Sequence, residues 1–343
     1  MRKFFEIIFI LSLILFINIP CHAQEKGNVV YKEFQPFKMV FLPDINLAFF
    51  DRDDKILFQE SLAIFQDVIK KLNQQDSPDF VIFGGNLTYN ENGKFSDLPM
   101  FLDAASNLNA PYYAITGDRE ANLAEDVCKE NFIKEFDEYD YETMKQTFWT
   151  AEPIKNVLLI GLDTSVKNEK AGYLNLHQLF WLDSILKNNR DKFTIIAMHH
   201  PAIITTDLDK KSWQEYTLKK PELFLELINS YPQVKIILSG HHLCNYTAQI
   251  NEKLFIINPS ITVYPNEYKI LEVYPDKIEV ENKKISFKQI IKKAKTNLIN
   301  SSYAKEFNSK KPEAVVKYQQ GKAFSRKTKY YFNEKKSGLL FLN

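Results

Sequence analysis

The sequence has little glycine, little cysteine and almost no net charge. Of its 343 residues, 10 are glycine and 3 are cysteine, and the charged side chains balance to +1. So few cysteines exclude a disulfide scaffold. The balanced charge argues against a disordered chain, and no nucleic-acid partner is expected. Aromatic residues are instead abundant at 14%, and the apolar fraction of 45% is ample for a hydrophobic core.

Long apolar runs are also missing, except at the N-terminus. There Arg2 and Lys3 precede "IIFILSLILFINI", and "CHA" leads to Gln24. This pattern predicts a signal peptide over residues 1–23. The apolar run is shorter than the roughly 18–20 residues that span a membrane. An uncleaved anchor, or a lipoprotein signal that uses Cys21, is the alternative. We expect an exported protein, periplasmic or extracellular, with no transmembrane segment in the mature chain.

Two cysteines remain after removal of this signal peptide. They are Cys128 and Cys244. In an exported protein such a pair can form a disulfide, but two buried thiols are equally compatible with the sequence. The sequence leaves the two states open.

Short apolar runs alternate with segments of helical period after residue 36. Six runs are typical of buried strands, namely 38–42, 80–85, 112–116, 157–162, 194–198 and 234–240. Helices are predicted between them, over 58–72, 175–189 and 221–231. This order predicts an α/β fold with a largely parallel sheet. The runs after residue 246 are typical of a β-meander, so we expect a second sheet to pack on the first.

The chemical character of the chain changes at about residue 284. Residues 281–343 contain sixteen Lys and Arg but only four Glu, a net charge of +12. One helical face there is apolar and is formed by Phe287, Ile290, Ile291, Ala294 and Leu298. We therefore predict a domain over residues 24–283 and a basic helical extension over 284–343. The extension either docks with a solvated basic face or contacts an anionic surface.

Polar and ionisable residues directly follow five of the predicted strands. The segments are "PDIN", "GGNLT", "TGDRE", "MHHP" and "GHHL", which contain Asp44, Asn46, Asn86, Asp118, Arg119, Glu120, His199, His200, His241 and His242. Ligands of open α/β sheets bind at the carboxyl ends of the strands. Because burying such groups without partners is costly, these residues predict one shared site.

In order and spacing, these segments resemble the calcineurin-like metallophosphoesterases over about residues 36–280. The pattern of that family is Asp-x-His, Gly-Asp, Gly-Asn-His-Asp/Glu, a histidine-containing strand end and Gly-His-x-His. In members of that family, the residues of this pattern hold two metals, which activate a water for attack on phosphorus. The resemblance implies a sandwich of two packed mixed β-sheets flanked by helices.

The sequence departs from this pattern at several ligand positions. The first histidine, the bridging aspartate and the last histidine of the pattern are here Asn46, Asn86 and Leu243. The Asn-His pair is Asp118-Arg119. Leu243 has no lone pair and Asn86 has no charge, so the resemblance implies an eroded two-metal site.

The losses fall mainly on one of the two metals. Its remaining anionic ligand is Asp44, whereas the other metal keeps Asp118, His199 and His241. Two histidines and one carboxylate suffice for zinc, manganese or iron. We therefore expect at most one divalent transition metal per chain.

Arg119 replaces a histidine of the family pattern. It cannot act as a general acid, because the pKa of its guanidinium lies above about 12. It can orient a phosphate together with Asn86, or fill the space of the missing ion by pairing with Asp44 or Asp118. His200 lies beside the ligand histidine and is interpreted as structural or substrate-facing.

Two functions are compatible with these residues. The substitutions favour an inactive or weakly active binding or scaffold module of the cell envelope, a pseudoenzyme that keeps the fold. The alternative is a one-metal phosphoesterase that hydrolyses phosphomono- or diesters with water activated at Asp118, His199 and His241. In either case we expect the partner to be a phosphate-containing small molecule or an envelope polymer.

Overall fold

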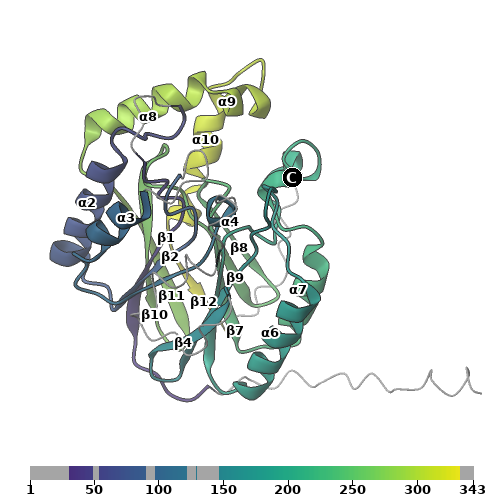
Figure 1. Cartoon of the computed structure of the whole chain (residues 1–343). Coiled ribbons are helices and arrows are strands. Elements are labelled where there is room, and N and C mark those ends of the chain that lie inside the picture. The colour runs from purple at the N-terminus through teal and green to yellow at the C-terminus, as the bar shows by residue number, and fades with distance from the viewer. Residues whose placement is uncertain (1–30, 49–53, 90–96, 122–128, 130–146, 333–343) are drawn as a thin grey trace, which may run out of the picture. The chain divides into compact units, whose positions relative to one another are not determined.

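The computed structural model describes residues 31–48, 54–89, 97–121, 129 and 147–332. These residues form two six-stranded β-sheets with helices on their outer faces (Figure 1). The first sheet has, in spatial order, β12 (Lys327–Tyr331), β11 (Lys277–Lys284), β10 (Glu267–Val273), β1 (Phe37–Leu42), β2 (Phe80–Phe83) and β3 (Tyr112–Ala114). The second has β4 (Trp149–Ile154), β5 (Val157–Leu162), β6 (Phe193–Met198), β7 (Val234–Ser239), β9 (Lys253–Ile257) and β8 (Tyr246–Ile250).

The central strands of the second sheet are short runs of apolar residues. β5, β6 and β7 are buried along their whole length and pair in parallel, as expected for strands covered on both faces. Along β5, Leu159 belongs to the core shared by the two sheets, whereas Leu158 and Ile160 belong to the core beneath the helices. The alternation of side chains along one strand therefore serves both cores.

Helices cover the outer face of each sheet. α6 (Leu176–Asn188) and α7 (Pro221–Asn229) pack on the second sheet. α2 (Ser61–Lys71) and α3 (Leu98–Ala105) lie over the first, where Phe65 and Phe101 contact Phe83 of β2. The remaining short helices of this part are η1 (Leu72–Asp76), α4 (Asp118–Ala121), η5 (Asp207–Lys210) and η6 (Gln214–Tyr216).

The six predicted strands are present, but they do not form one parallel sheet. β1, β2 and β3 pair in parallel in the first sheet, and β5, β6 and β7 do so in the second. The predicted meander is divided as well, because β9 pairs with β7 whereas β10 and β11 lie beside β1. The prediction of two packed, mixed sheets is confirmed. The assignment of strands to those sheets is wrong, because the apolar pattern of a strand does not specify its neighbour.

The basic C-terminal residues pack on the same core. They form α8 (Lys288–Asn300), α9 (Ser302–Phe307), α10 (Ala314–Gln320), α11 (Ala323–Arg326) and β12. Leu298, Tyr303 and Val315 are buried in the core of the two sheets. Only helices were predicted from the sequence here. The structure adds β12, which extends the first sheet by pairing with β11.

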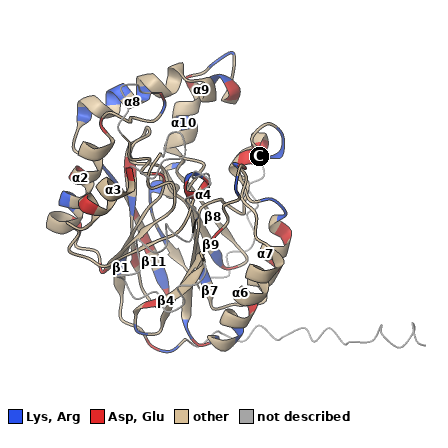
Figure 2. Ribbon diagram, in the orientation of Figure 1, with Lys and Arg blue, Asp and Glu red and all other residues tan. Residues whose placement is uncertain are grey.

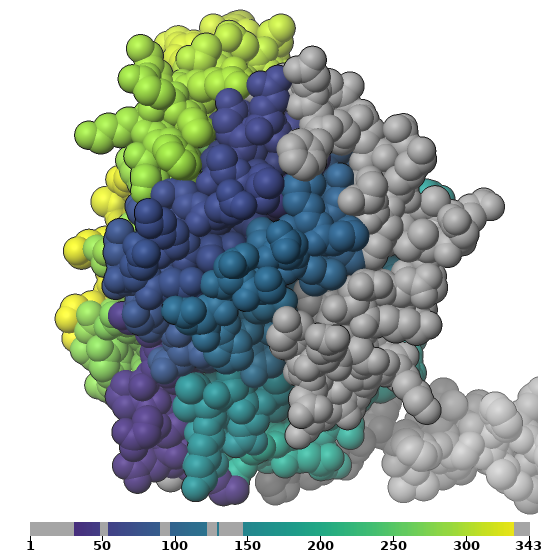
Figure 3. All heavy atoms as spheres, turned by 60° about the vertical axis from the view of Figure 1, so that its left-hand side comes forward, coloured from purple at the N-terminus to yellow at the C-terminus, as the bar shows by residue number. Residues whose placement is uncertain are grey.

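α8 lies beside α2, although the two helices are distant in the sequence (Figures 1 and 3). Lys293 Nζ is 2.7 Å from Glu60 Oε1, and the backbone N–H of Ser286 donates to Asp67 Oδ2 at 2.7 Å. Other lysines of α8 are exposed and give this helix a basic outer side (Figure 2). The helix is thus docked beside α2, and contact of its basic side with an anionic surface stays a prediction.

No helix in the part of the chain that the structure describes is long and apolar enough to cross a membrane. The predicted signal peptide, residues 1–23, and Cys128 lie outside the described residues. Cys244 is buried, and it forms no disulfide within the described ranges. Export and the state of the cysteine pair therefore stay predictions.

Candidate metal centre

The candidate centre is built from strand ends of both sheets. Asp44 follows β1, Asn86 follows β2 and Asp118 begins α4 after β3. His199 and His241 follow β6 and β7 of the second sheet. The carboxyl ends of parallel strands from the two sheets thus meet at one point, and the predicted shared site forms.

Several residues of this site have a left-handed backbone. The φ angle is 55° at Asp44, 52° at Asn86 and 62° at His241. Residues with a Cβ atom seldom adopt this conformation, and such strain is concentrated at functional sites. Gly240 allows the close approach of two of these loops, because a Cβ atom there would lie 2.6 Å from Asp44 Oδ2.

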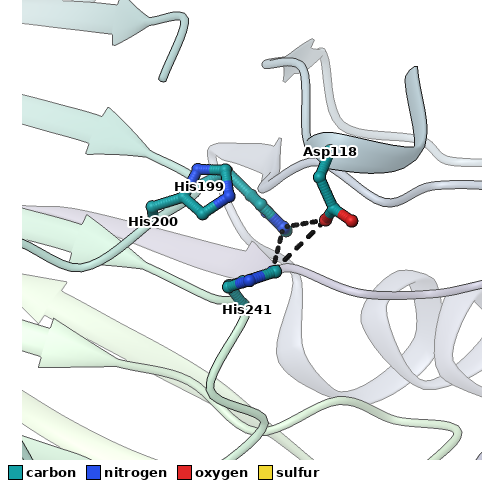
Figure 4. A group of neighbouring side chains, drawn as sticks. All are labelled: Asp118, His199, His200 and His241. Atoms are coloured by element: carbon teal, nitrogen blue, oxygen red, sulfur yellow. Dashed lines mark hydrogen bonds and ion pairs between the residues drawn. The ribbon is translucent and has the colours of Figure 1, made fainter. Parts of the chain in front are cut away.

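Asp118, His199 and His241 point towards one another (Figure 4). Asp118 Oδ1 is 3.5 Å from His199 Nε2 and 3.3 Å from His241 Nδ1. The same two imidazole nitrogens are 3.1 Å apart. With His200, these buried residues form a group whose ligand atoms all lie within 4.8 Å of one another. The group has the donor types that a divalent transition metal requires.

A backbone carbonyl fixes each of the two ligand histidines from behind. His199 Nδ1 is 2.7 Å from the carbonyl oxygen of Gly84, and His241 Nε2 is 3.2 Å from that of Glu215. A carbonyl only accepts, so these nitrogens carry a proton and donate it. The opposite nitrogens are the ones aimed at Asp118. Metal-binding histidines are oriented in this way in proteins, so the residues fit a metal.

The charges of the site are closely balanced around His199. Although burial by itself lowers the pKa of His199, the carboxylates of Asp44 and Asp118 raise that pKa to about 9. Burial raises the pKa of Asp118, but the charges of His241 and His199 hold it well below its usual range. A proton on His199 thus offsets part of the carboxylate charge, and binding of a divalent ion would displace it.

His200 also belongs to this group by distance, although the sequence suggested a structural or substrate-facing role. Both of its ring nitrogens are already engaged, since Nδ1 is 2.8 Å from Thr164 Oγ1 and Nε2 is 2.9 Å from the carbonyl oxygen of Lys170. Burial and the neighbouring histidines lower its pKa well below the usual range. We therefore assign His200 to the support of the centre.

Asn86 lies between the two aspartates. Its Nδ2 donates to Asp44 Oδ1 at 3.2 Å and to Asp118 Oδ1 at 2.9 Å, and its Oδ1 accepts from the backbone N–H of Arg119 at 3.0 Å. Asp44 Oδ2 also accepts from the backbone N–H of His241 at 2.7 Å. The amide thus separates two buried carboxylates, and Asp44 borders the centre through hydrogen bonds.

An apolar cluster surrounds Leu243, which stands at the position of the last histidine of the family pattern. Leu243 is buried there, and Tyr89 packs against the cluster. The other buried members are Ala48, Ile56, Phe58 and Val263. Asn46 Nδ2 donates to the backbone carbonyl of Asp44 at 2.8 Å, so its side chain supports the loop. The position of the lost histidine is therefore filled by hydrocarbon.

Arg119 stacks on a tyrosine. Its Cζ atom is 4.1 Å from the centroid of the Tyr89 ring, and its guanidinium forms no ion pair within the described ranges. The expectation that Arg119 would pair with Asp44 or Asp118 is wrong, because the face of Tyr89 holds the guanidinium instead. The positive charge beside the centre is thus not neutralised by either aspartate.

Glu120 connects the two loops that carry Asn86 and Asp118. Its Oε2 accepts from the backbone N–H groups of Asn86 and Gly117, each at 2.8 Å, and its Oε1 accepts from that of Leu87 at 2.9 Å. Burial raises the pKa of Glu120, and these hydrogen bonds oppose that shift. Glu120 is therefore a positioning residue.

His242 faces the C-terminal segment. Its Nδ1 is 3.1 Å from the hydroxyl of Tyr318 in α10. Its Nε2 is 3.1 Å from Asp209 Oδ1, outside hydrogen-bond geometry. Trp213 stacks on Tyr303 of α9 beside it. The C-terminal helices thus support the loop that carries the ligand histidine of β7, a contribution that no local sequence motif could have indicated.

Comparison with protein families agrees with this geometry. A model of the calcineurin-like phosphoesterases matches residues 40–245, and the chain belongs to this family. Among solved structures, a dimetal phosphatase from Danio rerio superposes with a TM-score of 0.58 at 13% identity over 72% of this chain and 96% of that one. A purple acid phosphatase from yellow lupin gives 0.55 at 14% identity, over 74% and 52% of the two chains. The fold implied by the resemblance is confirmed.

The chain is also similar to curated phosphodiesterases. It is 28% identical over 180 residues to a probable glycerophosphodiester phosphodiesterase of Arcobacter nitrofigilis, covering 52% of this chain and 62% of that protein. It is 23% identical over 228 residues to a 3',5'-cyclic adenosine monophosphate phosphodiesterase of Haemophilus influenzae, covering 63% and 73%. The chain thus spans less than two thirds of the length of the first of these relatives.

Proposed function

We propose that this protein hydrolyses phosphate esters with one divalent transition metal held by Asp118, His199 and His241. The observation that carries the proposal is the convergence of these three side chains, with each histidine anchored by a carbonyl on its far nitrogen. When bound, such an ion supplies positive charge to the phosphoryl group and lowers the pKa of water. Zinc, manganese and iron all suit two imidazoles and one carboxylate.

The chain's own residues have separate roles in this proposal. Arg119, presented on the face of Tyr89, binds phosphoryl oxygens through its guanidinium. Asn86 uses both N–H groups on Asp44 and Asp118, so it is a positioning residue and has no donor left for a phosphate. In this proposal Arg119 alone orients the phosphate, whereas the sequence suggested this role for Asn86 as well.

The substrate class is a phosphomono- or diester. The relatives named above are phosphodiesterases, and their similarity supports a diester. An ester of a small molecule and an ester within an envelope polymer both have this chemistry. The exposed lysines of α8 provide positive charge that could contact an anionic envelope polymer.

A binding or scaffold module is the second candidate, and one observation favours it. Leu243 and its apolar neighbours occupy the half of the site where the family pattern places a metal ligand. The negative charge of the phosphoryl group in the transition state would then be neutralised by one ion and Arg119. A site with two ions would stabilise this charge more strongly. In this candidate the centre binds a phosphate group without turnover.

Two measurements distinguish the candidates: hydrolysis of nitrophenyl esters by the native protein, and the same assay on a variant without the guanidinium of Arg119. We expect the manganese-, zinc- or iron-loaded protein to hydrolyse p-nitrophenyl phosphate or bis-p-nitrophenyl phosphate. Arg119→Met should lower kcat/KM about 10- to 100-fold, as expected for loss of a charge-assisted hydrogen bond, with metal content unchanged. Arg190→Met is the matched control, because Arg190 also lies over a tyrosine ring, that of Tyr231, but at the end of α6. Stoichiometric metal without any turnover would establish the binding module.

Export is the remaining part of the proposal. It is supported by the charged, apolar and small-residue order of residues 1–23. Mass spectrometry of the protein from the periplasm or the medium should show a mature N-terminus at or near Gln24. A retained 1–23 segment, or a lipid on Cys21, would contradict the cleaved signal peptide.

A further inference from the structure

A second cationic side chain lies beside the candidate metal centre. The Nζ atom of Lys55 is 3.9 Å from the centroid of the Tyr303 ring and 5.8 Å from that of Tyr216. The Tyr216 ring centroid in turn is 5.6 Å from that of His241. The ring of Tyr216 is therefore a neighbour of both the Lys55 ammonium group and His241.

The segment that carries Lys55 is fixed to the body of the protein. Ile56 forms a β-bridge with Val263, and the backbone N–H of Leu57 donates to the carbonyl oxygen of Thr262 at 2.9 Å. Ile56 also belongs to the apolar cluster around Leu243. The position of Lys55 is thus coupled to the apolar half of the site.

The ammonium group of Lys55 contacts aromatic faces. Within the described ranges its ammonium forms no hydrogen bond and no ion pair, and its contacts are the two tyrosine faces. The side chain is half-buried. Burial lowers its pKa to about 8, while the charges of Asp54 and Glu306 oppose the shift, so the group is mainly protonated at neutral pH. A half-buried cation whose described neighbours include no acceptor can pair with an anionic ligand.

Another lysine of this chain shows the usual arrangement. Lys277 Nζ is 4.5 Å from the ring centroid of Tyr274, but it is also 2.6 Å from Glu279 Oε1. It lies at the start of β11, at the same end of the sheet as the start of β1 and opposite to the centre. At that position a carboxylate of the protein completes the lysine–tyrosine pair. At Lys55 no carboxylate of the described residues takes this position.

We propose that Lys55, on the platform of Tyr303 and Tyr216, binds a second anionic group of the substrate. The protein then prefers phosphate esters that carry another negative charge away from the phosphate at the metal centre. This inference rests on the proposed phosphate site for the position of the first phosphate. Because Tyr303 belongs to α9, the C-terminal segment also takes part in substrate selection.

Equilibrium binding of two matched sugar phosphates tests the proposal. Fructose 6-phosphate and fructose 1,6-bisphosphate differ by one phosphate, and calorimetry measures both on the full mature protein purified without chelator. The native protein should bind the bisphosphate at least about tenfold more tightly, which is the effect of one charge-assisted contact. Lys55→Met should remove this preference and leave the affinity for the monophosphate within about twofold. Lys55→Arg should retain the preference.

The control variant and the kinetic assay separate the possible failures. Lys277→Met should keep the preference, because this lysine lies at the far end of the sheet. An unchanged monophosphate affinity in Lys55→Met shows that this variant is folded. Equal binding of the two sugars by the native protein, or a preference that survives in Lys55→Met, overturns the inference. A Lys55-dependent preference without any turnover of nitrophenyl esters supports the anion site and refutes only the proposed hydrolysis.

Discussion

Replacement of His199 by alanine is expected to abolish stoichiometric metal binding and to lower kcat/KM for phosphate esters by on the order of 100-fold or more. The imidazole is fully buried, its Nδ1 is held by Gly84, and its Nε2 lies within 3.5 Å of Asp118 and 3.1 Å of His241. The methyl group of alanine supplies no ligand atom in place of this nitrogen. Elemental analysis of the native protein should give at most one zinc, manganese or iron per chain, and the variant should give none.

His177→Ala is the matched control for this experiment. His177 is exposed on α6, outside the group of ligand atoms, so its loss should change neither metal content nor turnover. Two ions per chain in the native protein with robust diesterase activity would contradict the one-metal site. Full metal content in His199→Ala would show that the metal lies elsewhere.

Asn86→Asp is expected to make the stability of the protein depend on metal. The native amide donates to Asp44 and Asp118, whereas a third carboxylate would lose both hydrogen bonds and place like charges together in a buried site. We expect the free energy of unfolding in chelator to fall by about 3 kcal/mol, as for an uncompensated buried charge. Added manganese or zinc should restore it, because the new carboxylate is an anionic ligand. Denaturant titrations with and without metal measure both effects.

Asn258→Asp separates the metal effect from the general cost of a buried charge. Asn258 is fully buried and its Nδ2 donates to the backbone carbonyl of Phe41 at 2.7 Å. This variant should also be destabilised, but added metal should not restore its stability. If Asn86→Asp is equally stable with and without metal, residue 86 does not stand at the position of the bridging aspartate of the family pattern.

Much of the fold was predictable from local patterns. The apolar runs that became β1, β2, β3, β5, β6 and β7 are short and uninterrupted, and the helix over 175–189 ends within a residue or two of α6. The period of the apolar residues in such segments indicates whether each forms a strand or a helix. The strands β4, β8 and β12 were missed, and their sequences are mixed with polar residues: β12 is "KTKYY" and alternates exposed and half-buried side chains at the sheet edge.

The residues of the candidate site could be predicted from the sequence, but the contacts of their side chains could not. Asp118, His199 and His241 could be named because each directly follows an apolar run, and the structure brings these three together. The stacking of Arg119 on Tyr89 and the engagement of both nitrogens of His200 could not be named. They depend on side-chain directions, which are set by neighbours that are distant in the sequence.

The sequence by itself determined most of the strands, the polar residues at their ends and the departures from the family pattern at Asn46, Asn86 and Leu243. Those properties are carried by residue type and by period along the chain. Only the tertiary structure decided that the parallel strands divide between two sheets, that hydrocarbon around Leu243 fills the eroded half, and that α9 brings Tyr303 to Lys55 beside the centre. The reason is physical: these relations arise from contacts between residues far apart in the sequence, whose free energies depend on the packed fold as a whole and not on any local pattern.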